Sequence, residues 1–441
     1  MQVDLTKYSR LIKDANPIVV YGKVSEIIGL VVEGHGPIAS IGDMCAIFPH
    51  GDDRYQYPVI AEVVGFRKGR VLLMPLETLQ GLGPGCKILS FGKKANVNVG
   101  PKLLGRIIDG MGNPMDGKGP IEHEKVYPLY AEPINPLDRE PISEPMDLGI
   151  RVINSLFTCG KGQRMGIYAG SGVGKSVLLG MMAKSTNADV NVIGLIGERG
   201  REVREFLEKN LGEEGLARSV VVVSASDRHP LIRMRAAYVA TAISEYFRDR
   251  GLNVLLMVDS LTRFAMAQRE VGLSIGEPPA TKGYTPSVFS LLPRLLERAG
   301  SLEGSGSITG LYTILVEGDD FNEPISDATR AILDGHISLS RALANRNHYP
   351  AVDVLDSISR VMIDVVDDEH RVKSNELLNI VATYKRAEDL INIGAYVSGS
   401  NAEIDYAIKM IDSVNVFLKQ GIDEKVNFER SRRELVSLFQ E

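Results

Sequence analysis

Residues 169–176 read Ala-Gly-Ser-Gly-Val-Gly-Lys-Ser, which is the pattern of a phosphate-binding loop. An apolar run at residues 165–168 precedes the loop and suits a buried strand, and residues 177–183 follow it and suit a helix. Small residues let successive backbone N–H groups close around phosphate oxygens at the positive end of a helix. The sequence therefore predicts a nucleotide-phosphate site built by Ala169, Gly170, Ser171, Gly172, Val173, Gly174, Lys175 and Ser176.

Two side chains of this loop carry its chemistry. Lys175 would bring a positive charge to the terminal phosphates, and the Ser176 hydroxyl would be a magnesium ligand. The position of the usual first glycine holds Ala169 instead. Glycine adopts a positive φ without steric penalty, and alanine does not. Ala169 must therefore keep an ordinary backbone angle; otherwise the match to the pattern is accidental.

Two carboxylates follow the loop at the ends of apolar runs. Glu198 comes shortly after residues 190–196, and Asp259 closes residues 255–258. In a parallel sheet the carboxyl ends of the strands face the ligand crevice. Glu198 could there orient or deprotonate a water that attacks a γ-phosphate. Asp259 has the place of a second magnesium-binding carboxylate, although an Asp after a strand is more often a turn or a helix cap.

Four more candidates are ambiguous on the sequence alone. Glu202 is either a further carboxylate near the metal or a solvated helix residue. Arg199 is either a site residue or an ion-pair partner of Glu202 on a helix face. Arg360 lies in a strand-to-loop segment and has the local features of a surface ion pair. Tyr349 directly precedes Pro350 and could stack on a purine, but a half-buried core tyrosine is the favoured interpretation.

The elements that must position these residues change in character along the chain. Residues 17–92 are rich in β-branched residues with glycine punctuation, which predicts a small sandwich or barrel. After a proline-punctuated connection, near-continuous apolar runs alternate with helical patterns and predict a parallel sheet flanked by helices. These runs are residues 190–196, 219–223, 253–258 and 311–316. The carboxyl-terminal part is mostly helical, most clearly at residues 372–389 and 402–419.

The predicted division of the chain follows from these changes. It has an amphipathic arm, a β-barrel, a nucleotide-binding core and a helical domain, at residues 1–16, 17–92, 93–366 and 367–441. A length of 441 residues agrees with two to three domains. The net charge of −6 disfavours a nucleic-acid-binding surface. Without an apolar run of membrane-spanning length or a signal-peptide pattern, and with scattered cysteines, we expect a cytoplasmic protein with reduced thiols and no zinc.

The loop and the motifs that follow it in the sequence resemble, in their order along the chain, those of the rotary ATPase α/β superfamily. The motifs after the loop are residues 197–199, 259–263 and 350–359, and the similarity runs from about residue 19 to the carboxyl terminus. The loop opening at residues 169–171, with its alanine, and residues 279–289 and 317–324 resemble the type III protein-export branch of that superfamily. Residues 387–396 and 399–405 are most similar to the flagellar members of the branch.

This resemblance implies a P-loop, RecA-like α/β core with a mainly parallel sheet, flanked by an amino-terminal β-barrel and a carboxyl-terminal helical domain. It further implies a homohexameric, Mg²⁺-dependent ATP hydrolase with nucleotide at the subunit interfaces. By the same resemblance, the catalytic carboxylate is Glu198, and the phosphate and metal ligands are Lys175, Ser176 and Asp259. The resemblance makes Arg360 the arginine finger that is given to a neighbouring subunit, and Tyr349 the residue beside adenine. It places Arg199 and Arg263 near the site.

The implied setting is the cytoplasm, peripheral to the membrane at a flagellar export gate. The implied partners are a stator-like regulator that engages the amino-terminal arm, a coiled-coil central stalk protein, export chaperones and the gate itself. Three alternatives stay open: the ATPase of a virulence type III secretion system, a rotary synthase subunit, and a nucleotide-binding ring subunit without turnover. Glu198 disfavours the last, since such a subunit would lack the carboxylate for the attacking water.

Overall fold

The computed structural model describes residues 19–50, 57–316 and 320–440. They divide into two compact units, one comprising the described residues up to Ala95 with Ser274–Glu277 and the other comprising Asn96–Leu273 with the described residues from Pro278 onward. The predicted amphipathic arm at residues 1–16 lies outside the described residues. The predicted boundary at residue 367 falls inside the second unit and stays a prediction.

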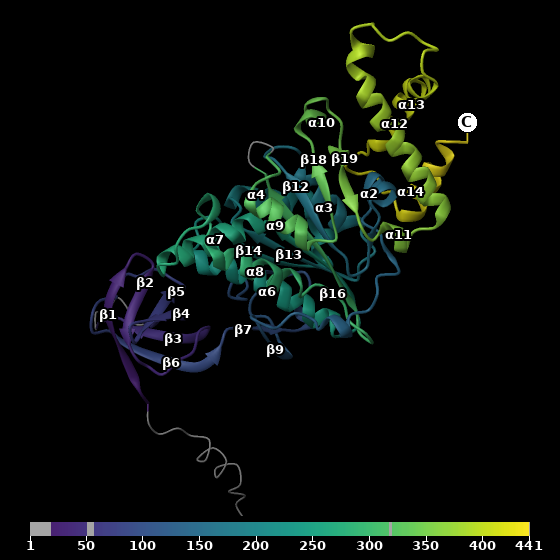
Figure 1. Cartoon of the computed structure of the whole chain (residues 1–441). Helices are drawn as coiled ribbons and strands as arrows, with labels where there is room; N and C mark the ends of the chain where they lie inside the picture. Colours follow the sequence, from purple (N-terminus) through teal and green to yellow (C-terminus); the bar gives the residue numbers. More distant parts are fainter. Residues whose placement is uncertain (1–18, 51–56, 317–319, 441) are drawn as a thin grey trace, which may run out of the picture. The chain divides into compact units, whose positions relative to one another are not determined.

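The first unit contains a closed antiparallel barrel (Figure 1). Its strands follow one another around the barrel in the order β1-β2-β5-β4-β3-β6, and β6 pairs back onto β1. Closure leaves no unpaired strand edge, and alternate apolar side chains such as Val32, Leu73 and Ile88 fill the interior. The barrel form of the prediction is thus confirmed. The strands are β1 (Tyr21–Ile28), β2 (Val31–His35), β3 (Asp43–Phe48), β4 (Val59–Arg67), β5 (Arg70–Pro75) and β6 (Lys87–Lys94).

The second unit is built on a mainly parallel sheet in the order β19-β18-β12-β17-β15-β13-β14-β8. Among the described strands of this sheet, β18·β19 and β16·β17 are the antiparallel pairs. The predicted parallel sheet is therefore confirmed, and residues 190–196 coincide with β13. The strands are β8 (Ile107–Asp109), β12 (Arg164–Ala169), β13 (Val190–Ile196), β14 (Ser219–Ser224), β15 (Asn253–Asp259), β16 (Gly300–Ser301), β17 (Ser307–Leu315), β18 (Gly335–Leu339) and β19 (Val352–Ser359).

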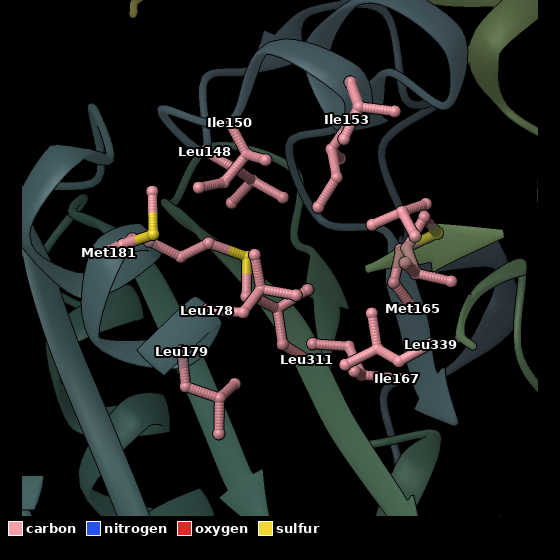
Figure 2. Packing of buried hydrophobic residues seen from close by; sticks show 14 of the residues in the cluster. Leu148, Ile150, Ile153, Met165, Ile167, Leu178, Leu179, Met181, Leu311 and Leu339 are labelled. Atoms are coloured by element: carbon pink, nitrogen blue, oxygen red, sulfur yellow. The ribbon is translucent and has the colours of Figure 1, made fainter. Parts of the chain in front are cut away.

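The two faces of this sheet are covered by different helices, because successive side chains of a strand point to opposite faces. Ile193 and Leu195 of β13 belong to the same buried cluster as α3 (Lys175–Ser185). Gly194 between them approaches Ala240 of α6 (Pro230–Arg248). Figure 2 shows α3 side chains beside the sheet and the 148–153 segment; the labelled residues are Leu148, Ile150, Ile153, Met165, Ile167, Leu178, Leu179, Met181, Leu311 and Leu339.

The remaining helices of the second unit connect the strands or flank the sheet. They are α2 (Arg151–Leu156), α4 (Gly200–Glu205), the π-helix η3 (Phe206–Leu211), α5 (Gly212–Ala217), α7 (Leu261–Ser274), α8 (Pro286–Leu296), α9 (Pro324–Ile332), α10 (Arg341–Asn345) and α11 (Met362–Val365). Short elements complete the unit: β7 (Asn96–Val99), β9 (Lys125–Pro128), β10 (Pro145–Met146), β11 (Cys159–Gly160), η1 (Pro101–Leu103), η2 (Pro136–Asp138) and η4 (Thr281–Gly283).

The carboxyl-terminal part consists of α12 (Asp368–Asn392), α13 (Ala402–Leu418) and α14 (Phe428–Ser437). Each begins at a side chain that accepts a hydrogen bond from the first turn, as an N-cap does: Asp367, Asn401 and Asn427. Both predicted helical segments are confirmed. Leu377, Val414 and Leu435 join the buried cluster beneath the sheet, so these helices pack on the nucleotide-binding core.

Candidate nucleotide site

The loop between β12 and α3 has the backbone of a phosphate cradle. Gly172 and Gly174 have φ of 77° and 91°, a region that disfavours residues with a Cβ. Gly174 caps α3, so the loop amides stand at the helix N-terminus. Ala169 is the buried last residue of β12, paired with Leu315 on one side and with β18 on the other. Its backbone is extended, as predicted, so the alanine is no obstacle to the loop.

Lys175 meets both predicted carboxylates. Its Nζ contacts Asp259 Oδ1 and lies 3.5 Å from Glu198 Oε1. β12, β13 and β15 are parallel, so their carboxyl ends lie at one edge of the sheet, and the three side chains extend from that edge. Burial opposes the charge on Lys175, but Asp259 and Glu198 together hold its pKa above the ordinary value. The ammonium therefore stays charged where terminal phosphates would lie.

Asp259 is fixed by a neighbour that the sequence interpretation missed. Thr313 of β17, the strand beside β15, donates its hydroxyl to Asp259 Oδ1 at 2.7 Å. Asp259 is 3% exposed, and a buried carboxylate needs hydrogen-bond donors, which Thr313 and Lys175 supply. The available signal was weak, since Thr313 is one of several hydroxyl residues in a strand that is buried over most of its length. Thr313 thus orients the carboxylate that is the candidate metal ligand.

Glu198 has the electrostatics of a general base. It follows Gly197, whose φ of 69° turns the chain sharply after β13. Burial raises the pKa of Glu198 to about 7, against the opposing effect of Lys175 and with added repulsion from Asp259. A hydrogen bond with the Glu202 side chain favours the protonated form further. A carboxylate with a pKa near neutrality can accept a proton from water within the ordinary working range.

Arg199 and Arg263 lie beside Glu198 in different ways. Arg199 points into solvent with 80% of its side chain exposed and pairs with Glu202 at 3.3 Å, which is the ion-pair alternative. Arg263 of α7 packs its stem against Gly197, where an added Cβ would come within 2.8 Å of Arg263 Cβ. The Arg263 Nε is buried and has no hydrogen-bond partner among the described residues. Of the two arginines, only Arg263 is packed against the turn that carries Glu198.

Tyr349 lines a cleft of about 550 Å³ next to the loop. Its ring approaches Gly174, where an added Cβ would lie 3.4 Å away, and the residue is 40% exposed. This exposure favours the ring as a stacking surface over the core tyrosine preferred from the sequence. The cleft is lined by Gly172, Val173, Gly174, Val177, Leu178, Met181, Leu339, Asn347, Tyr349, Pro350, Ala351, Lys419, Gln420, Gly421 and Ile422.

The far wall of this cleft comes from the turn after α13, which the sequence interpretation did not identify. Gln420 holds the turn in place, since its backbone N–H donates to the Tyr349 carbonyl at 3.0 Å. Its side-chain amide donates to the Gly149 carbonyl at 2.9 Å and accepts from the Arg151 N–H at 2.7 Å. A lone glutamine after a helix carries no local signal of such a role.

Arg360 lies away from the other candidates. It follows the edge strand β19, is exposed, and its backbone N–H donates to the Asp334 carbonyl. The Asp334 N–H in turn donates to Arg164, the first residue of β12. The phosphate loop begins at the other end of that strand, which at about 3.3 Å per residue is roughly 17 Å distant along it. Arg360 therefore stands at the end of the sheet opposite to its own chain's loop.

Three family models match the chain. The nucleotide-binding domain of the ATP synthase alpha/beta family matches residues 149–359, and the β-barrel domain of that family matches residues 24–92. The C-terminal domain of the type III secretion ATPase EscN matches residues 366–437. The chain belongs to the ATP synthase α/β family. The resemblance seen in the sequence motifs is thereby confirmed, together with the fold that it implied.

Within this family, the chain is similar to flagellar and secretion ATPases. It is 55% identical to the flagellum-specific ATP synthase of Bacillus subtilis, over 95% of each chain. It is 50% identical to a type 3 secretion system ATPase of Xanthomonas euvesicatoria, over 95% of this chain and 94% of that one. The assembled ATPase EscN of an enteropathogenic Escherichia coli type III secretion system matches with a TM-score of 0.89 and 47% identity, covering 95% and 99% of the two chains.

A second structure shows assembled EscN in complex with its central stalk EscO, and the EscN chain matches with a TM-score of 0.87 and 46% identity, over 95% of this chain and 99% of that one. Among the residues that the structure describes, no helix is both long and apolar enough to cross a bilayer.

The residues of this α/β-family site fit a nucleotide with its metal. The left-handed glycines and the helix N-terminus form a cradle for phosphates, and Lys175 supplies the opposing charge. Ser176 is exposed on the first turn of α3, and Asp259 is close to Lys175. In the part of the chain that the structure describes, no three His, Cys, Asp or Glu side chains form a metal-ligand group. Magnesium at nucleotide sites takes most of its ligands from phosphates and water, so this donor set suits it.

Proposed function

We propose that this chain is the Mg²⁺-dependent ATP hydrolase of a flagellar type III protein export apparatus, acting as a homohexamer. The observation that carries the hydrolase proposal is the contact of Lys175 with Asp259 and Glu198 at the mouth of a glycine loop. A ring subunit that only bound nucleotide would need the lysine and the loop. It would not need a second carboxylate whose pKa is raised to about 7.

The proposed roles follow from these positions. The loop amides and Lys175 hold the phosphates, and Tyr349 stacks on the base in the adjoining cleft. Glu198 accepts the proton of the attacking water. Ser176 and Asp259 would hold Mg²⁺, which when bound neutralises charge on the phosphate oxygens. Arg263, and more weakly Arg199 and Glu202, support the Glu198 turn.

Arg360 is proposed to act on the nucleotide of a neighbouring subunit. Its place at the amino end of β12 keeps it far from its own loop, and its side chain is exposed, with one long hydrogen bond of 3.4 Å from Nη2 to the Arg330 carbonyl that it would exchange for another chain's site. Arginines that enter a phosphoryl-transfer site in this way raise the rate by about 10³–10⁵ in GTPases. A ring of copies is therefore part of the proposal, and the assembled state of the similar protein EscN supports it.

The experiment that tests this proposal is the ATPase rate measured against protein concentration. A site completed between subunits gives a specific activity that rises steeply with concentration, together with a rise in mass by light scattering. A specific activity that stays constant while the protein is monomeric would contradict the shared site. No turnover at any concentration would contradict the hydrolase itself.

The flagellar setting rests on the relatives. The similarity to several flagellum-specific ATP synthases supports it, and the similarity to the B. subtilis member extends over nearly all of both chains. By analogy with EscN and its central stalk, a coiled-coil stalk protein is the proposed axial partner. Export chaperones, a stator-like regulator and the membrane gate complete the proposed set, with the protein in the cytoplasm at the gate.

The second candidate is the ATPase of a virulence type III secretion system, favoured by the 50% identity to the X. euvesicatoria protein. Deleting the gene in its own host separates the two. Loss of flagellar filaments with secretion of effectors intact supports the flagellar assignment, and the reverse phenotype supports the alternative.

A further inference from the structure

A side chain from the β18–β19 connection reaches the phosphate loop from outside. Arg341, the first residue of α10, donates from Nη1 to the carbonyl oxygen of Ser171 at 3.0 Å. The contact follows from the sheet register, because β12 and β18 are parallel neighbours and Ala169 pairs with Leu339. Each contacting residue stands two positions beyond that last pair, so the loop and α10 leave the sheet side by side.

The contacted carbonyl is coupled to an amide of the cradle. The peptide bond between Ser171 and Gly172 is trans, so its C=O and the Gly172 N–H point in opposite directions in one plane. Fixing the carbonyl outward onto Arg341 therefore fixes the Gly172 N–H toward the inside of the loop. This is the side on which the cradle would meet phosphate oxygens.

The tip of the loop has little other support on its outer side. Ser171 and Gly172 are exposed, and a Cβ added to Gly172 would have no atom within 4 Å. Glycine has many accessible backbone conformations, so holding it in one left-handed conformation carries a large entropy cost. A single hydrogen bond from α10 to the neighbouring peptide group can therefore stabilise that conformation of Gly172.

The same connection holds the other end of the loop. After α10 the chain reaches Tyr349, whose ring packs on Gly174, the residue that caps α3. The β18–β19 connection thus touches the loop at Ser171 through Arg341 and at Gly174 through Tyr349. Between these two points lie the amides that would face the phosphates.

We propose that Arg341 is a positioning residue for phosphate binding, which acts through the Ser171 carbonyl by setting the direction of the Gly172 N–H. This inference rests on the proposed function, because it presupposes that the loop binds nucleotide phosphates. It adds to that function a residue outside the loop that sets the affinity for the phosphate chain.

The test uses the full-length chain with Arg341→Met, which keeps an unbranched side chain and removes the donor. The KM for Mg-ATP and the inhibition constant of pyrophosphate should both rise about three- to ten-fold, the range of one lost hydrogen bond. The kcat at saturating ATP should change less than about two-fold, since the expected loss is uniform binding. Arg341→Lys, which restores a charged donor, should recover part of the loss.

The matched control is Arg346→Met, at the residue that directly follows the same helix. Arg346 pairs with Glu388 of α12 at 3.4 Å, is 70% exposed and does not touch the loop, so its replacement should leave KM and the pyrophosphate constant unchanged. Thermal unfolding of all variants separates positioning from folding. The ratio of KM between Arg341→Met and wild type should also persist at high salt, whereas a direct charge effect on phosphate would be screened.

Three results would overturn the inference. They are an Arg341→Met protein with wild-type KM and pyrophosphate inhibition, an equal loss in Arg346→Met, and a loss that accompanies a lowered unfolding temperature without rescue by lysine. Failure of the proposed function looks different, because the wild-type protein itself would then neither hydrolyse ATP nor bind pyrophosphate.

Discussion

The two ends of strand β12 differ in what they gather. At its carboxyl end the chain brings together Lys175, Glu198 and Asp259 from segments up to 84 residues apart. Near its amino end stands Arg360, which has no partner from that group and is open to solvent. One end holds a site that is almost complete, and the other holds an exposed arginine that takes no part in it.

The difference indicates how the chemistry is divided. In a parallel sheet the carboxyl ends of the strands bear the ligand crevice, so any residue at the opposite end is unavailable to the crevice of its own chain. A second copy that presents its own β19 edge to the crevice would supply what the first lacks. Under the proposed function, each chain therefore contributes its crevice with Lys175, Glu198 and Asp259 to one interface, and its Arg360 to the site of a neighbouring chain.

The largest expected effect comes from removing Arg360, the side chain that each chain is proposed to supply to its neighbour. Arg360→Ala should lower ATP turnover by about 10³-fold or more, as the loss of arginine fingers does. Mixed rings with Glu198→Gln protomers should regain part of the activity, because an interface can then combine an intact Glu198 with an intact Arg360. Steady-state turnover across mixing ratios measures this. Silence at every ratio, with rings still formed, would show that Arg360 does not act across subunits.

Removing the carboxylate of Glu198, the proposed general base, should have the next largest effect. Glu198→Gln should lower kcat by about 10²-fold or more, with near-normal nucleotide binding by fluorescence titration, because only the proton acceptor is lost. Glu202→Gln is the matched change on its hydrogen-bond partner and should alter kcat only a few-fold. Persistent turnover in Glu198→Gln would assign the base elsewhere.

The raised pKa of Glu198 sharpens the assignment further. Burial raises this pKa to about 7, and the active form is the carboxylate, so kcat/KM should increase as the pH rises through 7. Activity at pH 6 should be about one tenth of the plateau reached near pH 8. Nucleotide binding measured over the same range is the control. A flat profile would mean that Glu198 does not act as the base in this window.

The smallest expected effect is at the cleft beside the loop. Tyr349→Ala should raise the KM for ATP about two- to ten-fold through the lost ring contact, and Tyr349→Phe should be neutral. Inhibition by pyrophosphate, which has no base, should be the same in all three proteins. Equal loss of pyrophosphate binding in Tyr349→Ala would instead make the tyrosine a support of Gly174.

Much of the fold could be predicted because it is encoded locally. The apolar run at residues 190–196 has the length and composition of a buried strand, and it coincides with β13. Residues 402–419 begin after Asn401, a cap residue, and nearly coincide with α13. The barrel was predicted only as one of two options, since closure depends on β6 pairing with β1 across the whole unit.

The sequence predicted which residues form the candidate site better than it predicted the contacts that hold those residues in place. The positions of Lys175, Glu198 and Asp259 could be inferred because Lys175 belongs to the glycine loop motif, while Glu198 and Asp259 stand at the carboxyl ends of apolar strands. Thr313, Arg341 and Gln420 were missed, since a hydroxyl within a strand, an arginine at a helix start and a glutamine after a helix have many ordinary explanations. Their roles depend on which elements become neighbours.

The sequence by itself determined the loop, the flanking strand and helix, and the family, because backbone preferences and glycine spacing act over a few residues. Only the tertiary structure decided the strand order, which puts β17 between β12 and β15 and so brings Thr313 to Asp259. It also decided that Arg341 reaches Ser171 and that Arg360 does not approach its own loop. These contacts depend on the register and order of strands far apart in the chain, which no local pattern specifies.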